Sequence, residues 1–437
     1  MMRVRNRTSL FVLAAVAVAL VCGSAAAEPA PKTIGDFQAI SIVTPKPYPV
    51  SFGDSARSWE VHFPGATYIR VHFTDFDLAD GDTVELFDPA GRRFRSYEGR
   101  GIHGTGDFWA HTVPGDTAIV RVQATVGGES GFEIDGFGAG FEPVFGDPPG
   151  SGDNGTDSVC GTQDWEDVEC YNGAPMYEKA RAVVKAIIGC CSSCTAWKMT
   201  DAGQFMYNEH CGTSQSDVAS TELLQNYTRY SCGGGGTGDG PSAFGSQLLA
   251  SDYTLDYTMM QATGVFDGIP CLSFAPRQAA NGDRLYIAHH PSGGVKKLSV
   301  NSTHPSNPNG WCEVDNNAVN GRGTATDIGY YCDTIGGSSG SPVLDYATHE
   351  VIGLHHFGGC LNSGARSDLI VDSLQSKGVV VGFCTDSGSG TPADCGNGVV
   401  EWPEQCDGGD LGGDTCKTLG FKRGSLSCAA DCTLDTS

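Results

Sequence analysis

The sequence predicts a mainly β fold in three units: a β-sandwich or jelly roll, a larger β domain and a small disulfide-rich module. Short runs that alternate apolar and polar side chains, such as residues 68–73 and 118–122, recur in the first part of the chain. Stretches rich in glycine, serine and proline at 146–158 and 386–394 divide the chain. Its 437 residues exceed the usual length of one domain, which agrees with this division.

The first 27 residues are predicted to be a secretory signal peptide. Arg3, Arg5 and Arg7 precede an apolar run at 10–21, and small residues at 24–27 provide a cleavage site. The apolar run is too short to span a bilayer core of about 30 Å. We therefore expect a secreted protein without a stable membrane anchor, whose β-sandwich spans residues 28–145 and whose linker spans 146–158.

The charge and the cysteines limit the classes of partner and cofactor. A formal net charge of −24 makes nucleic acid an unsuitable partner. The 18 cysteines favour disulfides, because an exported chain meets an oxidising environment. Their dispersed spacing lacks the paired Cys-x-x-Cys knuckles of zinc sites, so we expect no metal and no cofactor.

The central unit, residues 159–385, contains glycine-punctuated segments that are typical of strands, such as 283–289 and 351–354. Residues 174–189 suit either a helix or strands. Twelve cysteines lie between 160 and 384, and five more lie in the tail unit at 395–437, beyond the linker at 386–394. The distribution of the cysteines thus follows the same division into units.

A glycine- and serine-rich segment, Gly-Gly-Ser-Ser-Gly-Ser-Pro at 336–342, is typical of a nucleophilic serine on a tight turn. Ser339 occupies the nucleophile position of this motif. The backbone N–H groups of Gly337 and Ser339 are the expected oxyanion hole. Glycine suits this turn because it tolerates unusual dihedral angles and leaves room for a substrate.

His210 is the predicted general base, because it is followed by Cys211 and a matching Cys194 lies 17 positions upstream of that cysteine. Asp252 is the predicted third member, and Asp256 is its nearby competitor. We prefer Asp252 because a carboxylate within a mostly apolar strand needs a partner. The chain order His210, Asp252, Ser339 predicts a serine endopeptidase that acts on proteins or peptides.

Over residues 159–380 these motifs resemble the lysyl endopeptidase branch of the trypsin-like bacterial serine proteases, which have a chymotrypsin-like double β-barrel. A His-His-Pro segment at 289–291 adds to the resemblance and is not catalytic in that family. The first unit resembles the CUB-like or prepeptidase β domains that accompany secreted bacterial proteases. The tail resembles a myxobacterial cysteine-rich surface repeat, which implies attachment to the cell surface.

The resemblance also implies specificity for lysine or arginine. Asp368, in an Arg-Ser-Asp stretch after Cys360, is one candidate for binding the substrate's cation. Asp333, six residues before Ser339, is a rival. An aromatic-histidine pair carries over to Trp311 and His356, with His355 as an alternative to His356; a histidine in the pocket would instead favour glutamyl specificity.

By the same resemblance Cys160 pairs with Cys360, Cys170 with Cys232, and Cys194 with Cys211, while Cys312 and Cys332 pair locally. Four further cysteines of the central unit, at 190, 191, 271 and 384, are left for two more bridges. Five cysteines in the tail leave one thiol unpaired or indicate a truncated repeat.

Two departures from the family pattern make the alternative of an inactive, binding or adhesion protein worth testing. Tyr207, Asn208 and Glu209 replace the small residues that normally precede the histidine. Ser338 replaces the aspartate that pairs with a new N-terminus in animal trypsins. Activation must therefore differ, and cleavage within 146–158 is the predicted route.

Overall fold

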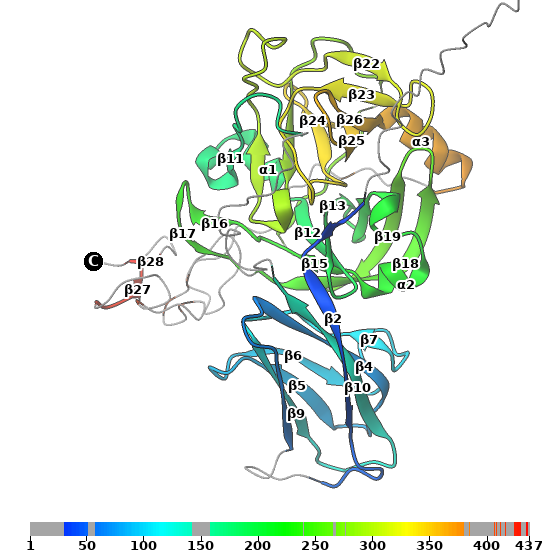
Figure 1. Ribbon diagram of the computed structural model, residues 1–437, viewed down its shortest axis with the longest axis vertical. Coiled ribbons are helices and arrows are strands. Elements are labelled where there is room, and N and C mark those ends of the chain that lie inside the picture. The colour runs from blue at the N-terminus through cyan, green and yellow to red at the C-terminus, as the bar shows by residue number, and fades with distance from the viewer. Residues whose placement is uncertain are drawn as a thin grey trace, which may run out of the picture.

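A computed structural model of the chain describes residues 30–50, 57–141, 158–238, 240–264, 268–275, 277–379 and 384, with scattered positions between 406 and 435 (Figure 1). The predicted signal peptide lies outside these residues. So do the predicted linkers, apart from Ser158 at the end of the first.

Residues 35–50 and 57–140 form a sandwich of two antiparallel sheets (Figure 1). Alternate side chains point into a shared apolar core, as with Val84 and Leu86 in the second sheet. The first sheet contains β2 (Gly35–Val43), β10 (Gly131–Gly140), β4 (Tyr68–Asp77), β7 (Phe108–Trp109) and β8 (Val113–Pro114). The second contains β3 (Ser58–His62), β9 (Thr117–Gln123), β5 (Thr83–Phe87) and β6 (Arg93–Glu98).

Six strands of the central unit close into a barrel, because β13 pairs with β12 on one side and with β14 on the other. The strands are β12 (Val183–Ile188), β13 (Ser192–Thr200), β14 (Gln204–Tyr207), β15 (Glu222–Leu224), β18 (Ser242–Asp252) and β19 (Tyr257–Thr263). Helices α1 (Pro175–Ala180) and α2 (Gln215–Ser220) flank them. A two-stranded ribbon of β16 (Arg229–Ser231) and β17 (Gly234–Thr237) extends from the barrel.

The second half of the central unit is an eight-stranded antiparallel sheet. Its strands in spatial order are β11 (Glu166–Asp167), β21 (Lys297–Ser299), β20 (Leu285–His289), β24 (Pro342–Asp345), β25 (Val351–Phe357), β26 (Asn362–Arg366), β23 (Asp327–Tyr330) and β22 (Asn316–Val319). Helix α3 (Ser367–Ser376) follows β26, and a short tail ribbon consists of β27 (Ser427–Cys428) and β28 (Leu434–Asp435). One core cluster joins the two halves, with Trp197 and Tyr257 from the barrel and Leu344 and Leu354 from the sheet.

The prediction of a mainly β fold is therefore confirmed. Residues 174–189, which suited both states, contain a helix and then a strand. Within the described residues, no helix is both long and apolar enough to cross a bilayer.

Seven disulfides link the described cysteines, and four of them are the pairs that the family resemblance implied: Cys160–Cys360, Cys170–Cys232, Cys194–Cys211 and Cys312–Cys332. The four remaining cysteines of the central unit form Cys190–Cys191 and Cys271–Cys384. In the tail Cys406 pairs with Cys428, and Cys416 is a free thiol.

The sandwich is joined to the barrel by a buried polar contact. Arg70 of β4 is fully buried and donates to the carbonyl oxygens of Ile187 (3.2 Å) and Ser220 (3.1 Å). Its guanidinium lies 3.6 Å from the carboxylate of Glu222 in β15, which is also fully buried. A charge in such a place is tolerated only with its countercharge and hydrogen bonds in place.

We predict that Glu222→Gln lowers the free energy of unfolding by about 3–5 kcal/mol, because it leaves Arg70 buried without a countercharge. Chemical denaturation monitored by intrinsic fluorescence measures this. The matched control is Glu178→Gln, which removes an ion pair with Arg181 from a carboxylate that is 57% exposed and should cost less than about 1 kcal/mol. Equal losses for both variants would contradict the assigned role of the buried pair.

Candidate active site

His210 lies in a 3-10 turn, Glu209–Cys211, directly after β14. The disulfide Cys194–Cys211 ties this turn to β13. The bulky residues before His210 fit the fold: Tyr207 is fully buried, and the Asn208 amide donates to the backbone oxygen of Asp256 at 2.8 Å. The segment that departs from the family pattern therefore supports the histidine.

Asp256, rather than Asp252, is the carboxylate beside His210. Its Oδ2 lies 2.7 Å from Nδ1 of His210, and its Oδ1 accepts the backbone N–H of His210 at 2.9 Å. Asp256 is fully buried in the turn between β18 and β19, with a left-handed φ of 50°. Burial by itself would raise the pKa of Asp256, but hydrogen bonds from His210 and His356 outweigh it and hold the pKa well below the usual range.

The prediction of Asp252 is thus wrong, and the structure gives the physical reason. Asp252 ends β18 and caps the turn after that strand, where its Oδ1 accepts the N–H groups of Thr254 and Leu255. Its other oxygen pairs with Lys377 at 2.8 Å. The criterion of a buried carboxylate in need of a partner was sound, but it describes Asp256, four residues further along the chain.

His356 connects Asp256 to a second carboxylate that sequence reasoning missed. Its Nδ1 lies 3.0 Å from Asp256 and its Nε2 lies 2.6 Å from Asp327, and all three side chains are fully buried. Burial would lower the pKa of His356, but the hydrogen bonds and charges of Asp256 and Asp327 raise it to about 9. Nothing in the local sequence around Asp327 indicates this contact, because β23 and β25 meet only through β26.

The loop that carries Ser339 has the backbone geometry that an oxyanion site needs. The carbonyl oxygen of Gly336 accepts from the Ser292 N–H at 2.7 Å, and that of Ser338 accepts from the Ser341 N–H at 3.1 Å. Because a trans peptide directs its N–H opposite to its C=O, the N–H groups of Gly337 and Ser339 point the other way. Neither donates to a protein acceptor within the described part of the chain.

Glycine is required at two positions of this loop. Gly337 has φ +95°, and a Cβ there would lie 2.6 Å from the nitrogen of Gly293. Gly340 has φ +89°, and a Cβ there would lie 2.2 Å from the oxygen of Thr195. Only glycine combines these dihedral angles with this close packing.

A chain of contacts brings the serine loop to the histidine. The N–H of Thr195, next to the disulfide cysteine Cys194, donates to the backbone carbonyl oxygen of Ser339 at 2.8 Å. The N–H of Gly340 donates to the backbone carbonyl oxygen of His355 at 2.9 Å. The side chain of the next residue, His356, contacts Asp256. Nε2 of His210 is buried without a hydrogen-bond partner among the described residues, so it is free to exchange a proton.

Ser338 and His289 secure the loop without a new N-terminus. Nδ1 of His289 lies 2.8 Å from Oγ of Ser338, and its Nε2 lies 3.1 Å from Oγ of Ser299. Burial, with a smaller effect of Lys297, lowers the pKa of His289 to about 3, so the ring is neutral. Ser338 therefore joins a neutral hydrogen-bond network where animal trypsins have a charge pair.

The residues predicted to determine substrate specificity contact other protein groups and not one another. Both oxygens of Asp368 pair with Arg366 (2.6 and 3.1 Å), and Trp311 packs against Arg284 with its indole N–H donating to Glu313 at 3.2 Å. His356 has both ring nitrogens occupied by carboxylates, and His355 contacts the Tyr330 hydroxyl at 2.8 Å. His356 therefore has no ring nitrogen available for an acidic substrate.

Asp333 is nearly fully buried next to a second carboxylate. Its Oδ1 accepts the N–H of Cys160 at 2.7 Å, and its Oδ2 accepts the N–H of Asp164 at 3.0 Å. Burial and the neighbouring Asp333 raise the pKa of Asp164 to about 7. Oδ1 of Asp164 is buried without a hydrogen-bond partner in the part of the chain that is described.

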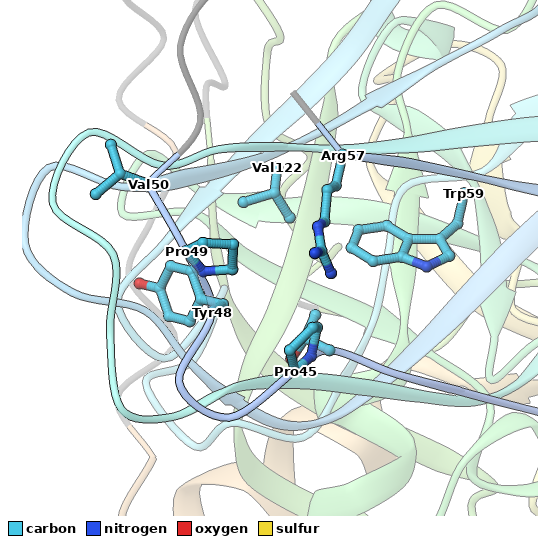
Figure 2. A pocket seen from close by; sticks show the side chains of 8 residues that line it. Pro45, Tyr48, Pro49, Val50, Arg57, Trp59 and Val122 are labelled. Carbon is cyan, nitrogen blue, oxygen red and sulfur yellow. The ribbon is translucent and has the colours of Figure 1, made fainter. Parts of the chain in front are cut away.

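Two pockets lie away from the candidate site residues, and one cluster of potential metal ligands consists of a disulfide and a histidine. Figure 2 shows a pocket in the sandwich between Pro45, Tyr48, Arg57 and Trp59, and another lies around Lys179 and Glu350; neither includes a candidate site residue. Donor atoms of Cys194, His210 and Cys211 lie within 4.8 Å of one another. The two sulfurs are bonded to each other, so they offer no thiolate to a metal.

Comparison with known proteins gives one family-model match and one matched relative. Residues 160–370 match the family model described as lysyl endopeptidase, C-terminal domain. A protein of Plasmopara viticola described as secreted RxLR effector protein 73 is 29% identical over 338 residues, which cover 72% of this chain and 81% of that protein.

Solved structures of proteases also match. The active form of the Rv3671c protease from M. tuberculosis is 15% identical with a TM-score of 0.35, covering 50% of this chain and 92% of that chain. The HtrA-type protease AlgW with a tripeptide is 17% identical with a TM-score of 0.33, covering 45% and 60%. The family match and the β-rich fold together support a serine protease-like unit in this chain.

The charge on His356 makes stability depend on pH. Its folded pKa of about 9 lies above the unfolded value of about 6.5, so its contribution is fully present below pH 6.5 and is lost as the pH rises to 9. We predict that His356→Gln melts at a lower temperature than the wild type at pH 6 and that this difference narrows by pH 9. Thermal melting of both proteins over this range measures it.

The neighbouring His355 provides the control, because burial holds its pKa well below the usual value and the ring is neutral above pH 6.5. The melting difference for His355→Gln should stay constant between pH 6.5 and 9. A constant difference for His356→Gln as well would contradict a charged His356.

Proposed function

We propose that this chain is a secreted serine endopeptidase in which Ser339 is the nucleophile, His210 the general base and Asp256 the residue that orients His210. The observation that carries the proposal is the 2.7 Å contact between His210 Nδ1 and Asp256, while His210 Nε2 has no hydrogen-bond partner among the described residues. The serine loop contacts β13, the strand to which the disulfide Cys194–Cys211 ties the histidine turn. Two N–H groups of that loop point away from the protein acceptors, as an oxyanion site requires.

The proposed reaction relies on these positions. Oγ of Ser339 bonds to the carbonyl carbon of the substrate while Nε2 of His210 takes its proton. The N–H groups of Gly337 and Ser339 hold the resulting oxyanion. His210 then gives the proton to the amine as the C–N bond breaks, and water hydrolyses the acyl-enzyme by the reverse sequence. Asp256, with its depressed pKa, stays ionised and stabilises the imidazolium.

An inactive, binding protein with the same fold is the alternative. Tyr207, Asn208 and Glu209 were the reason to consider it. Tyr207 packs in the barrel core, and Asn208 and Glu209 each make a polar contact in the site. Glu209 pairs with Arg322 at 2.8 Å, and Arg322 lies 3.4 Å from the carboxylate of Asp256. These contacts favour the enzyme, because they stabilise the position of His210 instead of displacing it.

We further propose cleavage after lysine or arginine, with Asp333 and Asp164 as the recognising carboxylates. The family match supports a basic substrate, and within the described residues no cation is among the hydrogen-bonding partners of the buried pair. A substrate ammonium or guanidinium would neutralise two adjacent carboxylates. Asp368 is a weaker candidate, because Arg366 already neutralises it.

Export is part of the proposal. The amino-terminal segment at 1–27 has the composition of a signal peptide, and the matched relative is described as secreted. The disulfides of the described units suit an oxidising environment. Attachment to a cell surface through the tail, and activation by cleavage within 146–158, remain predictions.

The predicted test of the catalytic carboxylate compares two aspartates that are four positions apart. Asp256→Asn should lower kcat for peptide hydrolysis by about 10⁴-fold, because the amide no longer fixes the imidazole tautomer. Asp252→Asn should change kcat less than about threefold, since the amide oxygen can still cap the turn and only the partly exposed ion pair with Lys377 is lost. Steady-state kinetics on a peptide substrate, with circular dichroism to check folding, measures both. The reverse order of effects would refute the assignment.

Substrate selectivity tests the proposed pocket. Asp333→Asn and Asp164→Asn should each lower the ratio of kcat/KM for a lysyl over a norleucyl peptide by tenfold or more, because loss of a buried charge partner costs at least about 2 kcal/mol. Asp368→Asn should change the ratio less than twofold. A large loss with Asp368→Asn alone would overturn the proposed pocket in favour of that residue.

A further inference from the structure

The edge of β13 next to Ser339 is occupied by the chain's own first strand. Strand β1 (Lys32–Thr33) pairs antiparallel with β13, Lys32 opposite Ser193 and Thr33 opposite Ser192. The N–H of Ile34 continues the pairing by donating to the oxygen of Cys191 at 2.7 Å. Figure 1 shows this blue segment crossing from β2 of the sandwich to the barrel.

This edge lies within two residues of the serine loop. Thr195, two residues after Ser193 on the same strand, donates its backbone N–H to the backbone carbonyl oxygen of Ser339. At about 3.3 Å per residue, β1 is paired roughly 7 Å along the strand from that contact. The side chain of Lys32 extends over the loop: a Cβ at Gly336 would lie 3.6 Å from its Cδ.

The edge flanks the leaving-group side of the site. His210 must hand its proton to the departing amine, so the leaving group lies on the His210 side of Ser339. Cys194, which adjoins the paired residues of β13, is bonded to Cys211, and Cys211 is the residue directly after His210. A substrate segment beyond the scissile bond would therefore run along Ser193 and Ser192.

The direction of β1 matches that of such a segment. Lys32 pairs with Ser193, closer to the Ser339 contact, while Thr33 and Ile34 pair with successively more distant residues of β13. The part of a substrate after the scissile bond likewise runs from its N-terminal to its C-terminal residues away from the nucleophile. Extended peptides can bind a protein by adding a strand to an exposed sheet edge.

Strand β1 is held in place by the residue directly after it, Ile34. This side chain is fully buried in a cluster with Tyr68 and Ile187, so it spans the sandwich and the barrel. The buried Arg70–Glu222 contact fastens the same two units together. Because the strand is tethered in this way, its effective concentration at the edge is high even for weak pairing.

We propose that β1 is an intramolecular competitor of peptide substrates, because it occupies the edge of β13 at Ser192 and Ser193 on the leaving-group side of the site. This inference rests on the proposed protease function. Cutting the chain between the sandwich and the barrel is then not enough to open the site, because β1 stays bound through the sandwich. Removal of residues before Ile34, or release of the whole sandwich, opens it.

The test uses the full chain, a variant that begins at Ile34, and Lys32→Pro, which does not shorten the chain. Because alternate N–H groups of a strand face the same edge and that of Ile34 donates to β13, this proline removes an N–H that faces β13. Two substrates share the same acyl side: one has a single arylamide leaving group, the other has four residues beyond the scissile bond. Both are made in lysyl, arginyl and glutamyl versions. The control variant is Asp36→Ala, an exposed position of β2 just after the competing strand. Melting curves establish that each variant is folded.

We expect both variants to raise kcat/KM tenfold or more for the extended substrate and to change it less than twofold for the arylamide, with Asp36→Ala equal to the wild type. The same change in both substrates, or in neither, would overturn the inference. If no protein cleaves either substrate, the protease proposal fails separately.

A binding measurement then decides the inference without catalysis. Fluorescence anisotropy of the labelled extended peptide is recorded on the Ser339→Ala protein, with and without the residues before Ile34. A tenfold gain in affinity on removal supports the competing strand. Equal affinities, or the absence of binding to both proteins, would contradict it.

Discussion

The carboxylate of Asp256 holds the two halves of the central unit in one arrangement. It accepts the backbone N–H and Nδ1 of His210 from the first barrel, and Nδ1 of His356 from the second sheet, in a site that excludes solvent. A buried carboxylate in such a place is stable only if these donors stay in position. The turn between β18 and β19, the histidine turn and β25 are therefore fixed relative to one another, and β25 in turn positions the serine loop through its contacts with Gly340 and Ser341.

A buried charge orients His210 at Asp256, whereas the loop that carries Ser339 is held by neutral groups. His289, with its low pKa, links Ser338 to Ser299, and the backbone oxygens of the loop are occupied by Ser292, Thr195 and Ser341. The loop therefore needs no charged N-terminus to reach its active geometry. In the proposal above, access to the site is instead limited at the neighbouring edge of β13, where the first strand of the chain lies. The sandwich, which holds that strand, would then control access of substrates.

Local motifs carried most of what the sequence could predict. The glycine-rich loop around Ser339 is readable because Gly337 and Gly340 are required by their dihedral angles, and His210 because a cysteine adjoins it. Asp252 was preferred to Asp256 because the burial of Asp256 depends on the β18–β19 turn, which only tertiary structure defines. Asp327 and the neutralisation of Asp368 by Arg366 depend on strand order and side-chain pairing. The pairing of β1 with β13 joins residues about 160 positions apart, and neither segment contains a local motif that would predict it.

The central claim, that Ser339 is activated by His210, is tested most directly by covalent labelling with an organophosphonate that reacts only with activated serines. Peptide mass spectrometry of the labelled protein should find a single adduct on Ser339, formed rapidly in the wild type and in Asp252→Asn, and at least a hundredfold more slowly in Asp256→Asn. The reagent is small and does not need the edge of β13, so β1 does not block it. A folded wild-type protein that remains unlabelled, or that is labelled on another serine, would contradict the account.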